Sequence, residues 1–110
     1  MPANSWRIMW VLAVFDCPVV SEDERRAYTQ FRKQLLKENF IQYQFSVYLK
    51  HFSTMAAAQA EIDRLKPSVP KGAHVAFFML TDKQYGLTQE FFGKSRAKIA
   101  PDAPKQIELF

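Results

Sequence analysis

The chain has 110 residues, 48% hydrophobic and 15% aromatic, which predicts one folded domain with its own core and excludes a disordered chain. Its formal net charge of +4 makes nucleic acid a reasonable partner, and its single cysteine excludes an internal disulfide or a multi-cysteine zinc site. No apolar run reaches the length of a membrane span and no signal peptide is visible, so we expect a cytoplasmic, soluble protein without a membrane partner.

The first predicted element is a strand over residues 6–15. Apart from Arg7, these residues are apolar on both faces and rich in valine, isoleucine and aromatic side chains. Such a run is typical of a central strand that is covered on both sides. The run stops at Asp16, and Cys17 and Pro18 then turn the chain away.

An amphipathic helix is expected next, from about Glu22 to Glu38. Ser21 and Glu24 have the spacing of a capping box, and Asn39 suits a left-handed stop. Helical spacing predicts an apolar face and a basic face. The apolar face holds Ala27, Tyr28, Phe31 and Leu35, and the basic face holds Arg25, Arg26, Arg32, Lys33 and Lys37.

Residues 40–50, FIQYQFSVYLK, alternate between apolar and more polar side chains. The alternation predicts a half-exposed strand, either continuous or bent into two pieces. Ile41, Tyr43, Phe45, Val47 and Leu49 would point one way, and Gln42, Gln44, Ser46 and Tyr48 the other.

A second helix is predicted from residue 55, capped by Ser53 or Thr54 and ended by Pro67. Its core-spaced residues are Met55, Ala58, Ile62 and Leu65. Residues 73–81 then predict a second strand that is apolar on both faces. Residues 81–86 suit a capped turn or a single helical turn, and residues 87–93 suit a fourth strand.

The order β-α-β-α-β-β predicts an α+β fold, a ferredoxin-like sandwich whose mostly antiparallel sheet carries two helices on one face. Residues 1–92 form this domain in our interpretation, and residues 93–110 a basic linker and a C-terminal strand. A sheet with one open face is a natural homodimer surface. Ten phenylalanines favour such an interface, and the alternative is a core that is merely rich in phenylalanine.

Several motifs occur in a specific order along the chain. They are FD-x-P at residues 15–18, the basic helix RRAYTQFRKQLLKENF, QFSVY, T-D-K-Q-Y at residues 81–85, and the C-terminal QIELF. In this order and spacing, the chain resembles CRISPR-associated protein two, the smaller of the two spacer-acquisition proteins, in the form found beside type II systems. The resemblance runs from about Trp6 to Phe110. It implies a ferredoxin-like homodimer that bridges two dimers of the larger CRISPR integrase and holds a short double-stranded DNA.

Asp16 is the candidate metal ligand and, if the protein cleaves nucleic acid, the candidate catalytic residue. Similar proteins are also described as metal-dependent ribonucleases or deoxyribonucleases, in which the acid after the first strand binds magnesium together with its symmetry mate. One carboxylate per chain is too little for such a site, and a homodimer would supply two. Alternatively, Asp16 caps the turn before Pro18. Ser46, near that acid in similar proteins, either holds a water or phosphate or pairs across the sheet.

The basic helix face suits non-specific contact with the phosphates of a duplex, because such binding needs cations along a backbone and no base-reading geometry. The alternative is an ordinary solvated face. Arg25 and Arg26 have the stronger claim, because the loop after the first strand faces DNA in similar proteins. A second basic cluster comprises Lys94, Arg96 and Lys98.

The C-terminal QIELF suits addition to a sheet edge of the other protomer or of the integrase, through Ile107, Leu109 and Phe110. A frayed tail is the alternative. His74 is expected to be a core or interface residue in a buried strand, and His51 a turn residue, with neither at metal-ligand spacing.

We therefore favour a dimeric DNA-binding scaffold for spacer acquisition over a magnesium-dependent endonuclease that uses Asp16 of both protomers. A small-molecule regulatory module is a third possibility, and the scarcity of glycine, with three residues, argues against its ligand loop.

Overall fold

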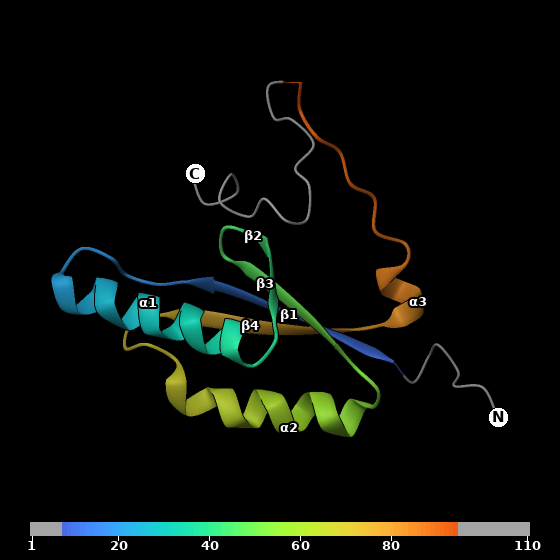
Figure 1. The fold of residues 1–110 in the computed structure, drawn as a ribbon, viewed down its shortest axis with the longest axis horizontal. Coiled ribbons are helices and arrows are strands. Elements are labelled where there is room, and N and C mark those ends of the chain that lie inside the picture. Colours follow the sequence, from blue (N-terminus) through green and yellow to red (C-terminus); the bar gives the residue numbers. More distant parts are fainter. Residues whose placement is uncertain (1–7, 95–110) are drawn as a thin grey trace.

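The computed structural model describes residues 8–94, which form a four-stranded antiparallel sheet with two long helices against it (Figure 1). The elements in chain order are β1 (Met9–Asp16), α1 (Glu22–Lys37), β2 (Ile41–Gln44), β3 (Val47–Phe52), α2 (Met55–Leu65), the 3-10 turn η2 (Lys66–Ser68), β4 (His74–Thr81) and α3 (Asp82–Tyr85). The strand order is β2-β3-β1-β4. The predicted α+β class is confirmed, and this order is consistent with a ferredoxin-like fold.

A single core lies between the sheet and the two helices. Its strand side is built from alternate residues of β1, and its helix side comes from both α1 and α2. Its members are Met9, Val11, Ala13 and Phe15 of β1, Phe31 and Leu35 of α1, Phe40 before β2, Tyr48 and Phe52 of β3, and Ala58, Ile62 and Leu65 of α2. Because alternate residues of a strand point to one face, both helices lie on that face of the sheet. The other face carries the even-numbered residues of β1.

The predicted helix signals are formed. Ser21 and Glu24 make both bonds of the capping box of α1, and Asn39 ends the helix with a φ of 70°. Thr54, rather than Ser53, caps α2. The prediction that Met55 belongs to the core is wrong: its side chain is 60% exposed, since it is the first residue of α2, a turn before the first buried one.

Residues 40–50 form a hairpin of two strands. The expected division into two pieces is present, but the chain reverses between them instead of bending. β2 and β3 pair antiparallel on either side of residues 45–46, with an irregular register between Gln42 and Gln44. The reversal breaks the two-residue alternation on which the prediction rested. Tyr48, expected among the polar side chains, is fully buried, whereas Ile41 and Phe45 are exposed.

The predicted fourth strand at residues 87–93 is also wrong. After α3, the predicted single helical turn, the chain follows an irregular path through residues 87–94. Leu87, Phe91 and Phe92 are exposed along it. The predicted C-terminal strand, with Ile107, Leu109 and Phe110, lies outside the described residues. Between residues 8 and 94, no helix is long and apolar enough to cross a membrane.

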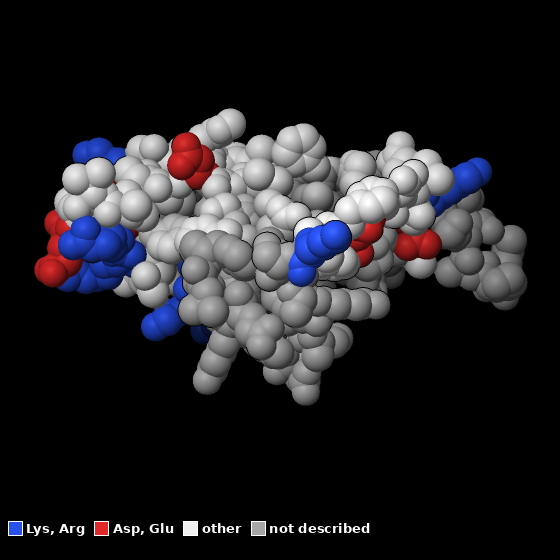
Figure 2. Space-filling model, turned by 90° about the horizontal axis from the view of Figure 1, so that it is seen from above, with Lys and Arg blue, Asp and Glu red and all other residues white. Residues whose placement is uncertain are grey.

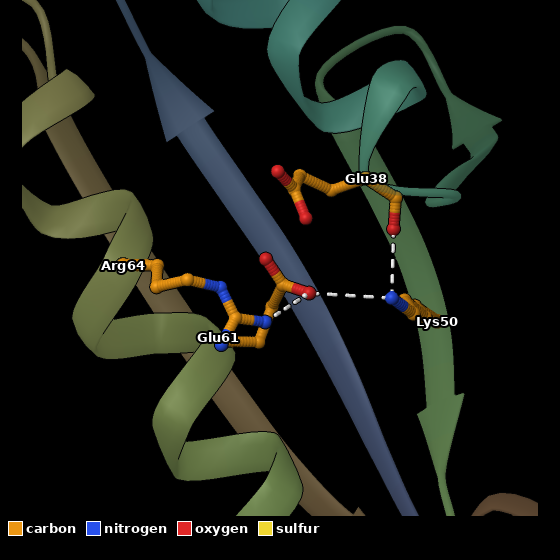
Figure 3. Close-up of polar contacts among 4 residues, drawn as sticks. All are labelled: Glu38, Lys50, Glu61 and Arg64. Carbon is orange, nitrogen blue, oxygen red and sulfur yellow. Dashed lines mark hydrogen bonds and ion pairs between the residues drawn. The ribbon is translucent and has the colours of Figure 1, made fainter.

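A buried ionic network on the helix-covered face of the sheet joins β3, α2 and the end of α1 (Figure 3). Among the described residues, Glu61 of α2 is the one charged side chain that is buried, with 1% exposure. Its Oε1 lies 3.2 Å from Lys50 Nζ of β3 and 3.1 Å from Arg64 Nη2. Lys50 Nζ also donates to the carbonyl oxygen of Glu38, at the end of α1, over 2.7 Å. Glu61 Oε2 has no hydrogen-bond partner.

Candidate functional site

Asp16 lies at the rim of the sheet on the face away from the helices. It is the last residue of β1 and is exposed, whereas its neighbour Phe15 is buried in the core. On this open face, Asp16 follows Trp10, Leu12 and Val14, because alternate residues of a strand share a face. The carboxylate is therefore accessible to an ion, a phosphate or a second protein chain.

His74 lies directly opposite Asp16, as the first residue of β4. Directly opposite residues of an antiparallel pair share a face, with Cβ atoms about 4.5–5.5 Å apart. His74 is exposed at the start of its strand, so the expectation of a core residue is wrong, and its alternative role as an interface residue stays a prediction. Only the pairing of β1 with β4 brings the two residues together. Because they lie far apart along the chain, the sequence alone does not indicate that they are neighbours.

The loop after Asp16 is held by side chains from the first turn of α1. Arg25 Nη1 donates to the carbonyl oxygens of Val19, at 3.2 Å, and Val20, at 2.8 Å. Glu24 Oε1 accepts the backbone N–H of Val20 at 2.9 Å. Hydrogen bonds from the backbone, chiefly from residue 21, lower the pKa of Glu24. The rim around Asp16 is thus organised by local contacts.

The turn before β4 contacts the turn after β1. Gly72 has a φ of 79°, and a Cβ added there would lie 3.5 Å from Pro18 Cγ. This left-handed conformation favours glycine, and it brings the two turns together beside Asp16 and His74. Cys17 instead packs against the core, and burial, followed by the charge of Asp16, raises the pKa of its thiol. A thiolate nucleophile is therefore disfavoured at this residue.

One chain supplies only part of a magnesium site. Within residues 8–94, no group of three or more histidine, cysteine, aspartate or glutamate side chains is arranged to hold a metal ion. Asp16 nevertheless fits the usual pattern, in which Mg²⁺ takes one or two carboxylates and completes its shell with water and substrate phosphates. Ser46 also lies at this rim, since its carbonyl oxygen accepts the N–H of Phe15 at 3.1 Å.

The five basic residues of α1 differ in their local partners. Arg25 contacts the loop carbonyls, Arg26 forms ion pairs with Asp23 at 3.0 Å and Glu22 at 3.7 Å, and Arg32 donates to the hydroxyl of Tyr48 at 2.9 Å.

Lys33 and Lys37 are exposed, and neither forms a hydrogen bond or ion pair with the described residues. Two shallow depressions run beside them along α1, lined mostly by basic and amide side chains. Figure 2 shows lysine and arginine side chains gathered at one end of the molecule, at the left, with acidic side chains beside them. In the second basic cluster, Arg96 and Lys98 lie outside the described residues.

The T-D-K-Q-Y motif has a structural role at the other end of the open face. Trp10 Nε1 donates to Asp82 Oδ1 at 2.7 Å, and the Trp10 ring stacks on Tyr85 with centroids 4.0 Å apart. These contacts attach α3 to β1. The exposed ring of Phe78, opposite Leu12 on β4, lies between this cluster and the Asp16 rim.

Tyr43 anchors the segment that follows α3, because its hydroxyl donates to Glu90 Oε2 at 2.6 Å. This hydrogen bond, then burial and the charge of Glu90, raise the pKa of Tyr43 to about 12. The neutral phenol is the form that donates. The contact is therefore intact below the usual tyrosine pKa of about 10, and its stabilising effect is lost as the pH rises towards 12.

Glu90→Gln should return the pKa of Tyr43 towards its usual value, because an amide adds no negative charge beside the ionising phenol. Nuclear magnetic resonance of the tyrosine ring signals during a pH titration measures this residue by residue. Tyr28, whose pKa is raised mainly by burial, is the internal reference and should not move. An unchanged titration curve in Glu90→Gln would show that Glu90 does not hold Tyr43 in solution.

The chain matches the family model described as CRISPR associated protein Cas2 over residues 9–87, from β1 to just beyond α3. Curated relatives from several bacteria carry the name CRISPR-associated endoribonuclease Cas2. The protein of Flavobacterium psychrophilum is 34% identical over 97% of this chain and 92% of its own length, and that of Paracidovorax avenae is 40% identical over 97% and 98%. The protein of Acidovorax ebreus is 42% identical over 93% of this chain and all of its own length. With a family model spanning the whole sheet and relatives matched along nearly their full length, the chain belongs to the Cas2 family of CRISPR-associated proteins.

Proposed function

We propose that the protein serves CRISPR adaptation as a homodimeric scaffold, which bridges dimers of the CRISPR integrase and binds the double-stranded DNA destined to become a spacer. The observation that carries this proposal is the basic face of α1. Lys33 and Lys37 are exposed and available there, and Arg25 and Arg26 follow the same helix to the rim of the sheet. A row of cations without base-reading geometry suits binding to a duplex of any sequence.

The open face of the sheet supports the homodimer. Phe78 is 54% exposed on it, opposite Leu12, and the exposed Phe91 and Phe92 follow α3. Exposed apolar side chains, such as Phe78 on the sheet and those of the segment after α3, favour association with a second copy, which buries the same surface twice. For Ile107, Leu109 and Phe110, we propose strand addition to the partner protomer or to the integrase.

A magnesium-dependent endonuclease, acting on RNA or on double-stranded DNA, is the second candidate function. It is favoured by the exposure of Asp16 on an organised rim and by the word endoribonuclease in the names of the relatives. Asp16 of each protomer would hold the ion, which when bound polarises a phosphate and lowers the pKa of a water. The scaffold role does not need this ion.

Spacer integration by the purified protein with its integrase tests the two functions. Asp16→Ala should assemble normally, because the carboxylate lies at the rim of the open face and makes no hydrogen bond or ion pair with the described residues. It should integrate within about twofold of the wild type, since phosphate contact by cations needs no carboxylate. Size-exclusion chromatography of the complex is the control for assembly. Loss of integration by an intact Asp16→Ala complex would contradict the scaffold proposal and favour the endonuclease.

A further inference from the structure

The pairing of His74 with Asp16 changes which ions this rim can hold. We propose that Asp16 and His74 of one chain form a two-donor site for a divalent first-row transition-metal ion. Mn²⁺ is expected to bind most weakly of these ions and is the probe in the test. The inference goes beyond the scaffold function and does not depend on it. It concerns binding of the metal, which requires neither nucleic acid nor cleavage.

The geometry of the strand pair supports two donors on one ion. Asp16 and His74 are register partners of β1 and β4, and both are exposed on the same face. Their Cβ atoms are expected about 4.5–5.5 Å apart. Two ligand atoms that each lie about 2.1 Å from one metal ion are about 3 Å apart, which these short side chains can reach.

Neither donor is occupied by the protein. Within the part of the chain that the structure describes, neither the carboxylate of Asp16 nor the imidazole of His74 makes a hydrogen bond or ion pair. Metal-binding lone pairs therefore remain available on both side chains, one on oxygen and one on nitrogen.

The surrounding rim is organised before an ion arrives. Arg25 holds the loop after Asp16, and the turn at Gly72, two residues before His74, contacts Pro18. Each donor thus follows or precedes a turn with defined contacts. Ligands that are already positioned lose little freedom on binding, which favours a site of few protein donors.

The chemistry of the donors selects the class of metal. Mg²⁺ prefers oxygen ligands, whereas an imidazole nitrogen suits the first-row transition metals, whose affinity for such a site rises from Mn²⁺ through Co²⁺ and Ni²⁺. A rim with Asp16 alone would hold Mg²⁺ and Mn²⁺ through the same oxygen. With His74 as a second ligand, the transition metals gain a bond that Mg²⁺ makes poorly.

Nuclear magnetic resonance of the untagged chain provides the test, because the protein has only two histidines. His51 is the internal control. It is exposed on the same face of the sheet, but its register partner Trp10 lies about 20 Å from Asp16 along β1, at roughly 3.3 Å per residue. At pH 7.5, Mn²⁺ should broaden the ring signals of His74 well before those of His51.

Affinities of matched variants complete the test. His74→Ala should weaken Mn²⁺ binding about tenfold and change Mg²⁺ binding less than about twofold, because it removes only the nitrogen donor. His51→Ala should change neither affinity, and Asp16→Asn should weaken both. The exposed positions tolerate these changes, and backbone amide spectra verify the fold.

Equal broadening of both histidines, or wild-type Mn²⁺ affinity in His74→Ala, would overturn the proposal. These results are independent of the scaffold function, which integration by Asp16→Ala tests in the presence of DNA. If the metal site exists without a role in integration, His74→Ala weakens Mn²⁺ binding and Asp16→Ala still integrates. If the protein is a scaffold without this metal site, His74→Ala keeps the wild-type Mn²⁺ affinity and Asp16→Ala still integrates.

Discussion

Replacing Lys50 with methionine should destabilise the protein by about 3 kcal/mol, the lower end of the cost of breaking a buried ion pair. The change leaves Glu61 buried, with Oε2 without a partner and Oε1 bound only by Arg64. It also removes the donor from the carbonyl oxygen of Glu38. A cost near the upper end of this range, about 5 kcal/mol, is not expected. Arg64, although exposed, still neutralises part of the charge of Glu61.

The double variant Lys50→Met, Glu61→Leu separates burial of a charge from loss of packing. With both charges replaced by apolar side chains, stability should lie within about 1 kcal/mol of the wild type, or above it. The methionine keeps an unbranched chain near the rings of Phe40 and Phe52, where Lys50 Nζ now lies 5.9 Å and 4.8 Å from the centroids.

Chemical denaturation with a common slope measures these stabilities. The matched control is Lys66→Met, which breaks the exposed pair of Lys66 with Asp63 and should cost less than about 0.5 kcal/mol. If Lys50→Met costs no more than this control, the buried network contributes nothing measurable to folding.

Structural features that depend only on residues close together in the sequence, within about one helical turn, could be predicted from the sequence. The capping box of Ser21 and Glu24, the left-handed Asn39 and the helical turn at residues 82–85 all depend on neighbours at most four positions away. The two long helices and the central strands follow from periodicity for the same reason. The element order was therefore predictable wherever local chemistry decided it.

The hairpin between β2 and β3 was not predictable in this way. Its turn at residues 45–46 is Phe-Ser, without the glycine or asparagine that marks tight hairpin turns. Without such a turn signal, the alternation of apolar and polar side chains predicts a single half-exposed strand, continuous or bent, and not a reversal of the chain. Tyr48 is buried because it pairs opposite Ala13 on the core face of β1, which is a consequence of register and not of sequence spacing.

Much of the candidate site depends on contacts between distant residues. Asp16 was identified from the end of its strand, but His74 became its neighbour only through the β1–β4 register. The basic face of α1 followed from helical spacing. The different partners of its arginines did not follow from helical spacing. They depend on a loop carbonyl for Arg25, the acidic first turn of α1 for Arg26 and the hydroxyl of Tyr48 for Arg32.

Replacing both Lys33 and Lys37 with alanine should give the largest loss of duplex binding among changes in α1. Both side chains are exposed without partners in the described structure, so a phosphate displaces no existing contact when it binds them. Arg25→Ala and Arg26→Ala should also weaken binding, but by less. Their guanidinium groups must first leave the loop carbonyls or the acidic residues Glu22 and Asp23.

The expected size of this loss can be stated as a change in the salt dependence of duplex binding. Each lost phosphate contact should lower the slope of log affinity against log salt concentration by about 0.9, or about 3.6 for two lysines in each of two protomers. Fluorescence anisotropy with duplexes of unrelated sequence measures this slope. The control is Lys66→Ala, which removes one cation per protomer from the turn after α2, outside the basic face. Phosphate contact predicts the same loss for every duplex. A loss that depended on sequence, or a weaker affinity with an unchanged salt slope, would instead mean that α1 acts through the fold or through base contacts, and the basic face would no longer support a scaffold that accepts any DNA.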